Sequence, residues 1–172
     1  MEEWDLYDKN RIKTGKVVRR GTQLNADEFH IVVHVCILNA ANQMLIQQRQ
    51  PFKTGWSNLW DVTMGGSAHA GESSNEAAQR ELWEEIGFKA DLSTTRPLFT
   101  INFPRGFDDF YVLQAEVSLD QLTLQPSEVQ AVRWASKAEI MQMIDDEQFV
   151  PYHASVIELV FDMHTQRGLH SG

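Results

Sequence analysis

The amino-acid sequence predicts an α/β (α+β) fold in which a mixed β-sheet is sandwiched by helices. Runs rich in β-branched and aromatic residues, typical of strands, occur on both sides of one well-capped helix. Two further helical patterns follow near the C-terminus. Strands combined with helices in this order favour a sheet with helices packed against it. The 172 residues suffice for one core, so we expect a single domain over residues 1–172.

The N-terminal half is expected to supply five strands. The run 30–38 is dense in valine and isoleucine, which is typical of a central strand. The run 44–49 begins with three apolar residues and is expected to pair with it as a strand, while 51–59 is expected to be a loop. Each of the five expected strands contains β-branched or alternating apolar residues. These strands span residues 4–8, 14–18, 30–38, 44–49 and 60–64.

The C-terminal half is expected to add strands at 97–103, 109–117 and 132–134. Ser136 is a good N-cap for a helix over 137–146. Pro151 opens a last helix towards Thr165, because apolar residues recur there at helical spacing.

Composition excludes several classes of protein. No stretch approaches the roughly 20 apolar residues of a membrane span, and the acidic N-terminus is unlike a signal peptide. A net charge of −9 argues against nonspecific binding of nucleic acid. Cys36 is the only cysteine, so no disulfide framework is expected and the reducing cytoplasm is the simplest setting.

The central helix has clear start and stop signals. Ser73 is a good N-cap, and Glu76 three residues later completes a capping box. Gly87 supplies the left-handed residue that ends the helix. Leu82 and Ile86 point to one side and are expected to face a core.

Carboxylates crowd a second side of this helix. At 100° per residue, Glu81, Glu84 and Glu85 fall within an arc of roughly 100°. Like charges at this spacing repel by roughly 0.2–0.5 kcal/mol per pair, so we expect a partner that neutralises them. Hard carboxylate oxygens suit Mg²⁺ or Mn²⁺, which bind substrate phosphates. A solvated acidic face is the alternative interpretation of the cluster alone.

The spacing over residues 66–88 resembles the Nudix box without departure. The matching residues are Gly66, Glu72, Arg80, Glu81, Leu82, Glu84, Glu85, Gly87 and Phe88. The resemblance implies an α/β/α sandwich and a metal-dependent hydrolase. Its partner would be a small-molecule diphosphate, typically a nucleoside diphosphate linked to another moiety.

The resemblance also implies roles inside the box. Glu84 and Glu85 would be the principal ligands of Mg²⁺ or Mn²⁺, with Glu81 a further ligand or the general base. Arg80 would orient the glutamates through a charge-assisted hydrogen bond. Two other positions complete the implied metal site: the carbonyl of Gly65, and Glu72 as a brace of the loop or a ligand through water.

Outside the box the candidates are weaker. Family members often recruit another acid as base or ligand, and Glu128 is the first candidate, followed by Asp108 and Asp109. Each of these is equally well explained as a solvated loop acid. Arg49 and Lys53 are candidates for holding substrate phosphates.

The region before the box resembles the Nudix subgroup that includes isopentenyl-diphosphate isomerase. An isomerase needs a cysteine just before the box glycine, where this sequence has Gly65. Of the metal-binding histidines, one matches His30, but Gln23 and Ser67 occupy two others. Hydrolysis is therefore favoured, with the isomerase as the alternative. His30 and His34 are interpreted as structural.

A second alternative is a Nudix module that senses a nucleotide without cleaving it. Such modules often lose box glutamates, and all are present here. Dimerisation is common among similar enzymes, although no feature of this sequence by itself indicates a homodimer.

Overall fold

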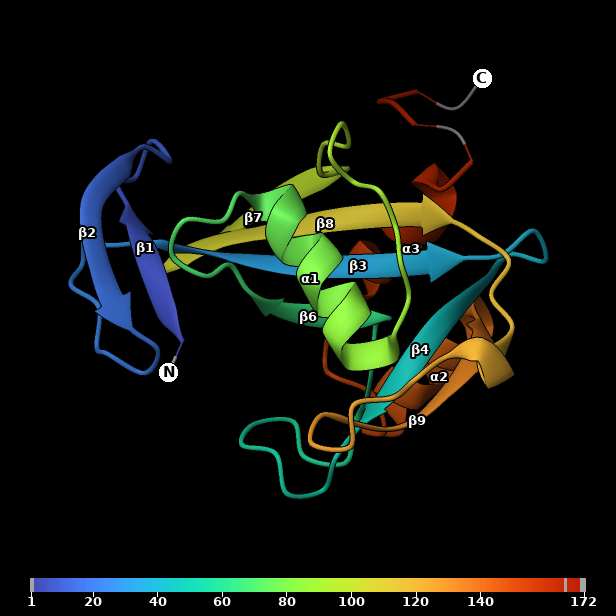
Figure 1. Ribbon diagram of the computed structural model, residues 1–172. Helices are drawn as coiled ribbons and strands as arrows, with labels where there is room; N and C mark the ends of the chain where they lie inside the picture. The colour runs from blue at the N-terminus through green and yellow to red at the C-terminus, as the bar shows by residue number, and fades with distance from the viewer. Residues whose placement is uncertain (1, 166, 171–172) are drawn as a thin grey trace. The chain divides into compact units, whose positions relative to one another are not determined.

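The computed structural model describes residues 2–165 and 167–170 and has the predicted mixed α+β fold with a mixed central sheet (Figure 1). In chain order the elements are β1 (Glu3–Tyr7), β2 (Lys13–Arg19), β3 (His30–Leu38), β4 (Gln43–Arg49), β5 (Trp60–Asp61), β6 (Met64–Ser67), α1 (Ser74–Ile86), β7 (Phe99–Phe103), β8 (Gly106–Gln114), the short 3-10 helix η1 (Leu119–Gln121), β9 (Val129–Ser136), α2 (Lys137–Asp145) and α3 (Ala154–Met163). The larger sheet has the order β5-β4-β3-β8-β7, with β6 paired to β3 and β9 to β4. Among the described residues, no helix is long and apolar enough to cross a membrane.

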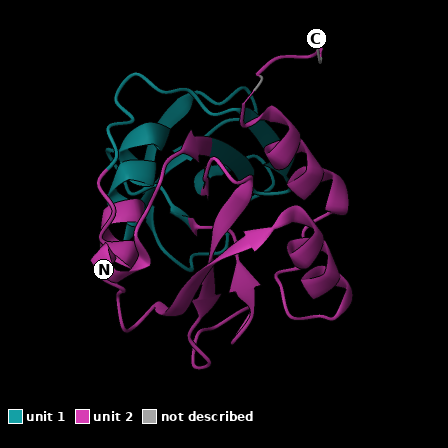
Figure 2. Cartoon of the chain, turned by 90° about the vertical axis from the view of Figure 1, so that its right-hand side faces the viewer, with its two compact units in different colours: residues 1–34, 65–81, 90–111 teal, residues 35–64, 82–89, 112–172 magenta. Residues whose placement is uncertain are grey.

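The chain divides into two compact units, coloured separately in Figure 2. One comprises residues 1–34, 65–81 and 90–111, and the other 35–64, 82–89 and 112–172. The elements β3, β6, β8 and α1 contribute residues to both units. At four of the five boundaries the chain therefore passes from one unit to the other within regular secondary structure, and the boundary between residues 89 and 90 lies outside it.

The first unit contains two hairpins. One joins β1 to β2, with Trp4 opposite Val18, so the expected strands 4–8 and 14–18 pair with each other. The other joins β7 to β8, and here the strand expected over 109–117 already begins at Gly106, opposite Phe103. A Cβ atom at Gly106 would lie 2.3 Å from the carbonyl oxygen of His30. Glycine is required there because the hairpin turn comes so close to β3.

The second unit contains most of the remaining sheet. β4 pairs antiparallel with both β5 and β9, and α2 packs against β9 and α3. Ser136 caps α2 through a complete capping box with Glu139, which confirms that prediction. Cys36 is fully buried in β3, as expected for a core strand.

The single strand expected over 60–64 is instead two short strands, β5 and β6. The hydroxyl of Thr63 accepts a hydrogen bond from the Ile37 amide at 2.9 Å and donates one to the Leu45 carbonyl at 2.5 Å. The carboxylate of Asp61 accepts from the Val62 amide. Side chains thus replace ladder hydrogen bonds at this point and interrupt the strand.

The central helix α1 has the predicted ends. The side chain of Glu76 accepts a hydrogen bond from the Ser73 amide at 2.8 Å, which is the carboxylate half of a capping box. Gly87 has a φ of 68°, and its amide donates to the Trp83 carbonyl at 3.0 Å. Leu82 and Ile86 are fully buried. The local signals therefore set both ends of the helix and its core-facing side.

Candidate functional site

Arg80 of α1 holds two carboxylates and the loop that precedes the helix. Its Nε and Nη2 atoms donate to the two oxygens of Glu72 at 2.7 and 3.0 Å. Its Nη1 lies 2.9 Å from Oε1 of Glu81, and Nη2 also donates to the Ser67 carbonyl at 3.1 Å. Charge-assisted pairs of this two-pronged kind fix direction as well as distance. Arg80 therefore sets the position of Glu81 relative to the loop.

Glu72 closes the loop on itself. Burial acts to raise its pKa, but hydrogen bonds from Arg80 and from the His69 amide outweigh burial and hold the pKa below its usual value. The carboxylate is consequently ionised at neutral pH. These contacts make Glu72 a brace between the loop and the helix.

Gly66 makes room for Glu81. A Cβ atom on Gly66 would lie 2.1 Å from Oε1 of Glu81, well inside contact distance. At Gly65 a Cβ atom would lie 3.2 Å from Nδ1 of His34. A side chain at position 66 is therefore excluded for a steric reason, because the Glu81 carboxylate lies directly against the backbone of Gly66.

The other two helix glutamates differ in exposure. Glu84 is exposed, whereas Glu85 is only 6% exposed. Oε2 of Glu85 accepts a hydrogen bond from Nε2 of Gln47 on β4 at 2.9 Å. Gln47 itself is 2% exposed. Glu85 is therefore a desolvated carboxylate held by a neutral donor.

Within residues 2–165 and 167–170, no group of three or more His, Cys, Asp or Glu side chains is placed to hold a metal ion. The donors nevertheless fit Mg²⁺ or Mn²⁺ in kind, because α1 offers several carboxylates and hard cations prefer oxygen ligands. The space at Gly66 admits one of them, Glu81, beside the backbone. The oxygen donors are therefore of the kind that hard divalent cations prefer.

A second polar cluster surrounds Arg49 at the end of β4. Its Nη1 lies 3.6 Å from Oδ2 of Asp61, and Oδ1 of Asp61 accepts a hydrogen bond from the Tyr152 hydroxyl at 2.8 Å. Nε of Arg49 is buried and has no hydrogen-bond partner within the described part of the chain. Asp61 is paired directly with Gln47 between β5 and β4, so the partner of Arg49 lies opposite the residue that contacts Glu85.

Lys53 and Glu128, a predicted phosphate ligand and a predicted catalytic acid, form an ion pair with each other. The two other acids proposed from the sequence are also paired. Asp108 contacts Nε2 of His34 at 3.0 Å, and the fully buried Asp109 binds Arg11, Ser74 and Thr100.

Two polar residues of the site were not expected from the sequence: Gln47 and Asp61. The sequence gives no clear signal for Gln47, because the polar residues Gln48 and Arg49 follow it directly.

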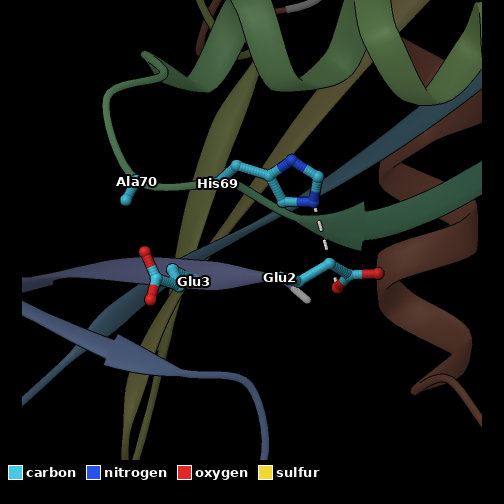
Figure 3. Close-up of a pocket in the computed structure, with 4 residues that line it drawn as sticks. All are labelled: Glu2, Glu3, His69 and Ala70. Carbon is cyan, nitrogen blue, oxygen red and sulfur yellow. Dashed lines mark ion pairs between the residues drawn. The ribbon is translucent and has the colours of Figure 1, made fainter.

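A pocket of about 310 Å³ lies elsewhere, at the start of the chain (Figure 3). It is lined by Glu2, Glu3, His69 and Ala70, and Nε2 of His69 lies 3.9 Å from Oε2 of Glu2. Its two carboxylates would repel an anionic ligand. The pocket therefore does not resemble a phosphate site.

Comparison with known proteins adds to this geometry. Residues 28–160 match the family model described as the NUDIX domain. The chain belongs to the NUDIX family. A Nudix hydrolase of Listeria monocytogenes is 47% identical over 88% of this chain and 90% of its own length. The chain is accordingly a Nudix hydrolase by family, and the predicted enzyme class is confirmed.

Two other similar proteins are informative. An isopentenyl-diphosphate Δ-isomerase of Pectobacterium atrosepticum is 30% identical over 86% of this chain and 84% of its own length. A solved structure from Deinococcus radiodurans superposes with a TM-score of 0.73 at 23% identity, covering 92% of this chain and 97% of that one. The first confirms the predicted relation to the isomerase subgroup, and the second confirms the fold.

The only cysteine, which is not at the isomerase position, and His30, which matches an isomerase histidine, both pack against other residues in this NUDIX protein. Cys36 has no exposed surface, and burial raises the pKa of its thiol. The His30 ring stacks on Trp4 with centroids 4.2 Å apart, and burial lowers the pKa of the imidazole. Both residues therefore have packing roles in this structure.

Proposed function

We propose that the protein is a Mg²⁺- or Mn²⁺-dependent hydrolase that cleaves a diphosphate linkage in a nucleotide or a related organic diphosphate. The observation that carries the proposal is the complete box with Glu81 held between Arg80 and the backbone at Gly66. Membership of the NUDIX family supports it. The intact set of box glutamates favours a catalytic role over a purely sensory one.

In this proposal Glu84 and Glu85 are the principal metal ligands. Glu81 is a further ligand or the general base, and Arg80 orients it. The carbonyl of Gly65 and, through water, Glu72 would complete the site. When bound, a divalent ion supplies charge neutralisation at the diphosphate oxygens and lowers the pKa of bound water.

The substrate's negative charge needs cations in an acidic protein. Arg49 is the better candidate, because its buried Nε donor has no protein acceptor within the described residues and its ion pair with Asp61 is long. Lys53 would reach a phosphate only after leaving Glu128. That exchange would also release the Glu128 carboxylate, which is the alternative general base.

The proposal is tested by turnover. A panel of nucleoside di- and triphosphates, dinucleotides, nucleotide sugars and prenyl diphosphates would be incubated with Mg²⁺, and released phosphate or monophosphate identified. Glu84→Gln and Glu85→Gln are each expected to abolish release, since each removes a charged metal ligand. Glu158→Gln, at an exposed site on α3, is the matched control and is expected to retain activity. Wild-type rates in both box variants would refute the proposal.

Isomerisation of isopentenyl diphosphate is the second candidate, because a relative with 30% identity carries that activity in its name. The position of the isomerase cysteine is Gly65, and Cys36 is buried. We therefore expect no dimethylallyl diphosphate when the protein is incubated with isopentenyl diphosphate and Mg²⁺. Detection of that product by mass spectrometry or NMR would reverse the ranking.

A further inference from the structure

Gln47 donates a hydrogen bond to the most deeply buried glutamate of the box. It lies in the middle of β4 with 2% exposure, and its Nε2 donates to Oε2 of Glu85 at 2.9 Å. Burying an ionised carboxylate is strongly unfavourable unless hydrogen bonds replace water. The amide of Gln47 therefore replaces part of the hydration that the Glu85 carboxylate loses on burial.

We infer that Gln47 is a positioning residue that presents Glu85 to the metal ion; this inference rests on the proposed function, in which Glu85 is a ligand. A hydrogen bond at Oε2 fixes the rotation of the carboxylate about its last carbon–carbon bond. That rotation determines the direction of the second oxygen, Oε1. Residues that orient metal ligands in this way commonly change metal affinity by about 10–100-fold when replaced.

The chemical type of residue 47 suits this role. A lysine or arginine would add a positive charge that competes with the incoming cation, whereas an apolar residue would remove the hydrogen bond to Oε2. A glutamate would place a third carboxylate beside Glu85 and Asp61, because Gln47 and Asp61 are directly opposed between β4 and β5. A neutral donor holds Glu85 without removing its charge.

The test is the Mn²⁺ affinity of the substrate-free protein, measured by calorimetry or from the electron paramagnetic resonance signal of free Mn²⁺. Gln47→Met keeps the size and removes the donor, and is expected to weaken Mn²⁺ binding by about tenfold. Gln48→Met is the matched control, because the Gln48 side chain donates to the Asn58 carbonyl instead. It is expected to bind Mn²⁺ as the wild type does.

A double variant separates positioning from general damage to the structure. If Gln47 acts through Glu85, then Gln47→Met is expected to cause no further loss of Mn²⁺ affinity once Glu85→Gln is present. An equal tenfold loss in that background would overturn the inference. Circular dichroism identifies unfolded variants. Should Gln47→Met not fold, Gln47→Asn, which is too short to reach Glu85, is expected to show the same tenfold loss.

The outcomes distinguish this inference from the proposed function. Wild-type Mn²⁺ affinity in a folded Gln47→Met protein, together with weakened binding in Glu85→Gln, would overturn the inference alone. Mn²⁺ binding that is unchanged in Glu85→Gln would overturn both. Absence of hydrolysis across the substrate panel, with Mn²⁺ binding that depends on both residues, would overturn the proposed reaction and uphold the role of Gln47.

Discussion

At the scale of single residues, the position of the Glu81 carboxylate depends on two neighbours. Arg80 holds it by a contact of 2.9 Å, and Gly66 leaves the space that it occupies. Neither relation follows from helix periodicity, which sets only the direction of Glu81 from the helix axis. The Glu81 carboxylate therefore gives a structural reason for both Gly66 and Arg80 in the box.

Gly66→Ala is expected to inactivate the enzyme with little loss of stability. The added methyl group would meet the end of the Glu81 side chain, which is flexible and can move away. Hydrolysis is expected to fall at least as far as in Glu81→Gln, while the free energy of unfolding changes by only about 1 kcal/mol. Kinetics and urea denaturation measure the two effects. A further large loss on adding Glu81→Gln would contradict this explanation.

Asp5 is predicted to contribute stability that is lost in acid. Burial acts to raise its pKa, but hydrogen bonds from Lys13 at 2.6 Å and from the Gly71 amide at 2.8 Å lower the pKa overall. A lowered folded-state pKa means that the contribution is complete above the unfolded pKa of about 3.9. It is lost as the pH falls through the lower folded-state value.

The measurement is the difference in unfolding free energy between wild type and Asp5→Asn as a function of pH. We expect a constant difference from about pH 5 to pH 7 that shrinks below about pH 4. A difference that grows in acid would contradict the direction of the pKa shift.

At the scale of elements, the β1–β2 hairpin is held by a buried carboxylate on β8. Arg11, at the hairpin turn, donates to Oδ1 of Asp109 at 2.8 Å, and Asp109 also accepts hydrogen bonds from Ser74 and Thr100. Ser74 is the first residue of α1. One carboxylate therefore connects the hairpin, the β7–β8 pair and the start of the box helix.

Arg11→Ala is expected to destabilise the protein by about 3 kcal/mol, because it leaves Asp109 buried without its cation. This value is at the lower end of the range for broken buried pairs, since Arg11 is one-third exposed. Urea denaturation measures it. Arg105→Ala is the control, because Arg105 is exposed and donates to the Pro104 carbonyl. Adding Asp109→Asn to Arg11→Ala is expected to recover part of the loss.

At the scale of the whole molecule, the single domain expected over residues 1–172 remains a prediction. The structure divides the chain into two compact units, and four elements supply residues to both. Breaking such elements at the boundary would sacrifice hydrogen bonds within α1 and the strands. We therefore predict that the two units unfold together.

Tryptophan fluorescence can test this prediction, because Trp4 lies in the first unit and the other four tryptophans lie in the second. The thermal transition of wild type is expected to coincide by fluorescence and far-ultraviolet circular dichroism, as in two-state unfolding. A variant that retains only Trp4 is expected to show fluorescence and circular dichroism transitions that coincide with each other. Two separated transitions would show that the units unfold independently.

The sequence by itself determined the family, the fold class and the ends of α1. These features depend on local signals: the spacing of the box, the cap at Ser73 and the left-handed Gly87. The strand β3 was likewise predictable, because a dense run of β-branched residues is a local property.

Only the tertiary structure decided which side chains meet. The pairs Gln47–Glu85, Arg49–Asp61 and Lys53–Glu128 join residues 12 to 75 positions apart. The break between β5 and β6 also depends on such contacts, since Thr63 bonds to the backbone of β3 and β4. Periodicity gives the direction of a side chain from its own strand or helix. The partner is set by the register and packing of segments distant in the sequence.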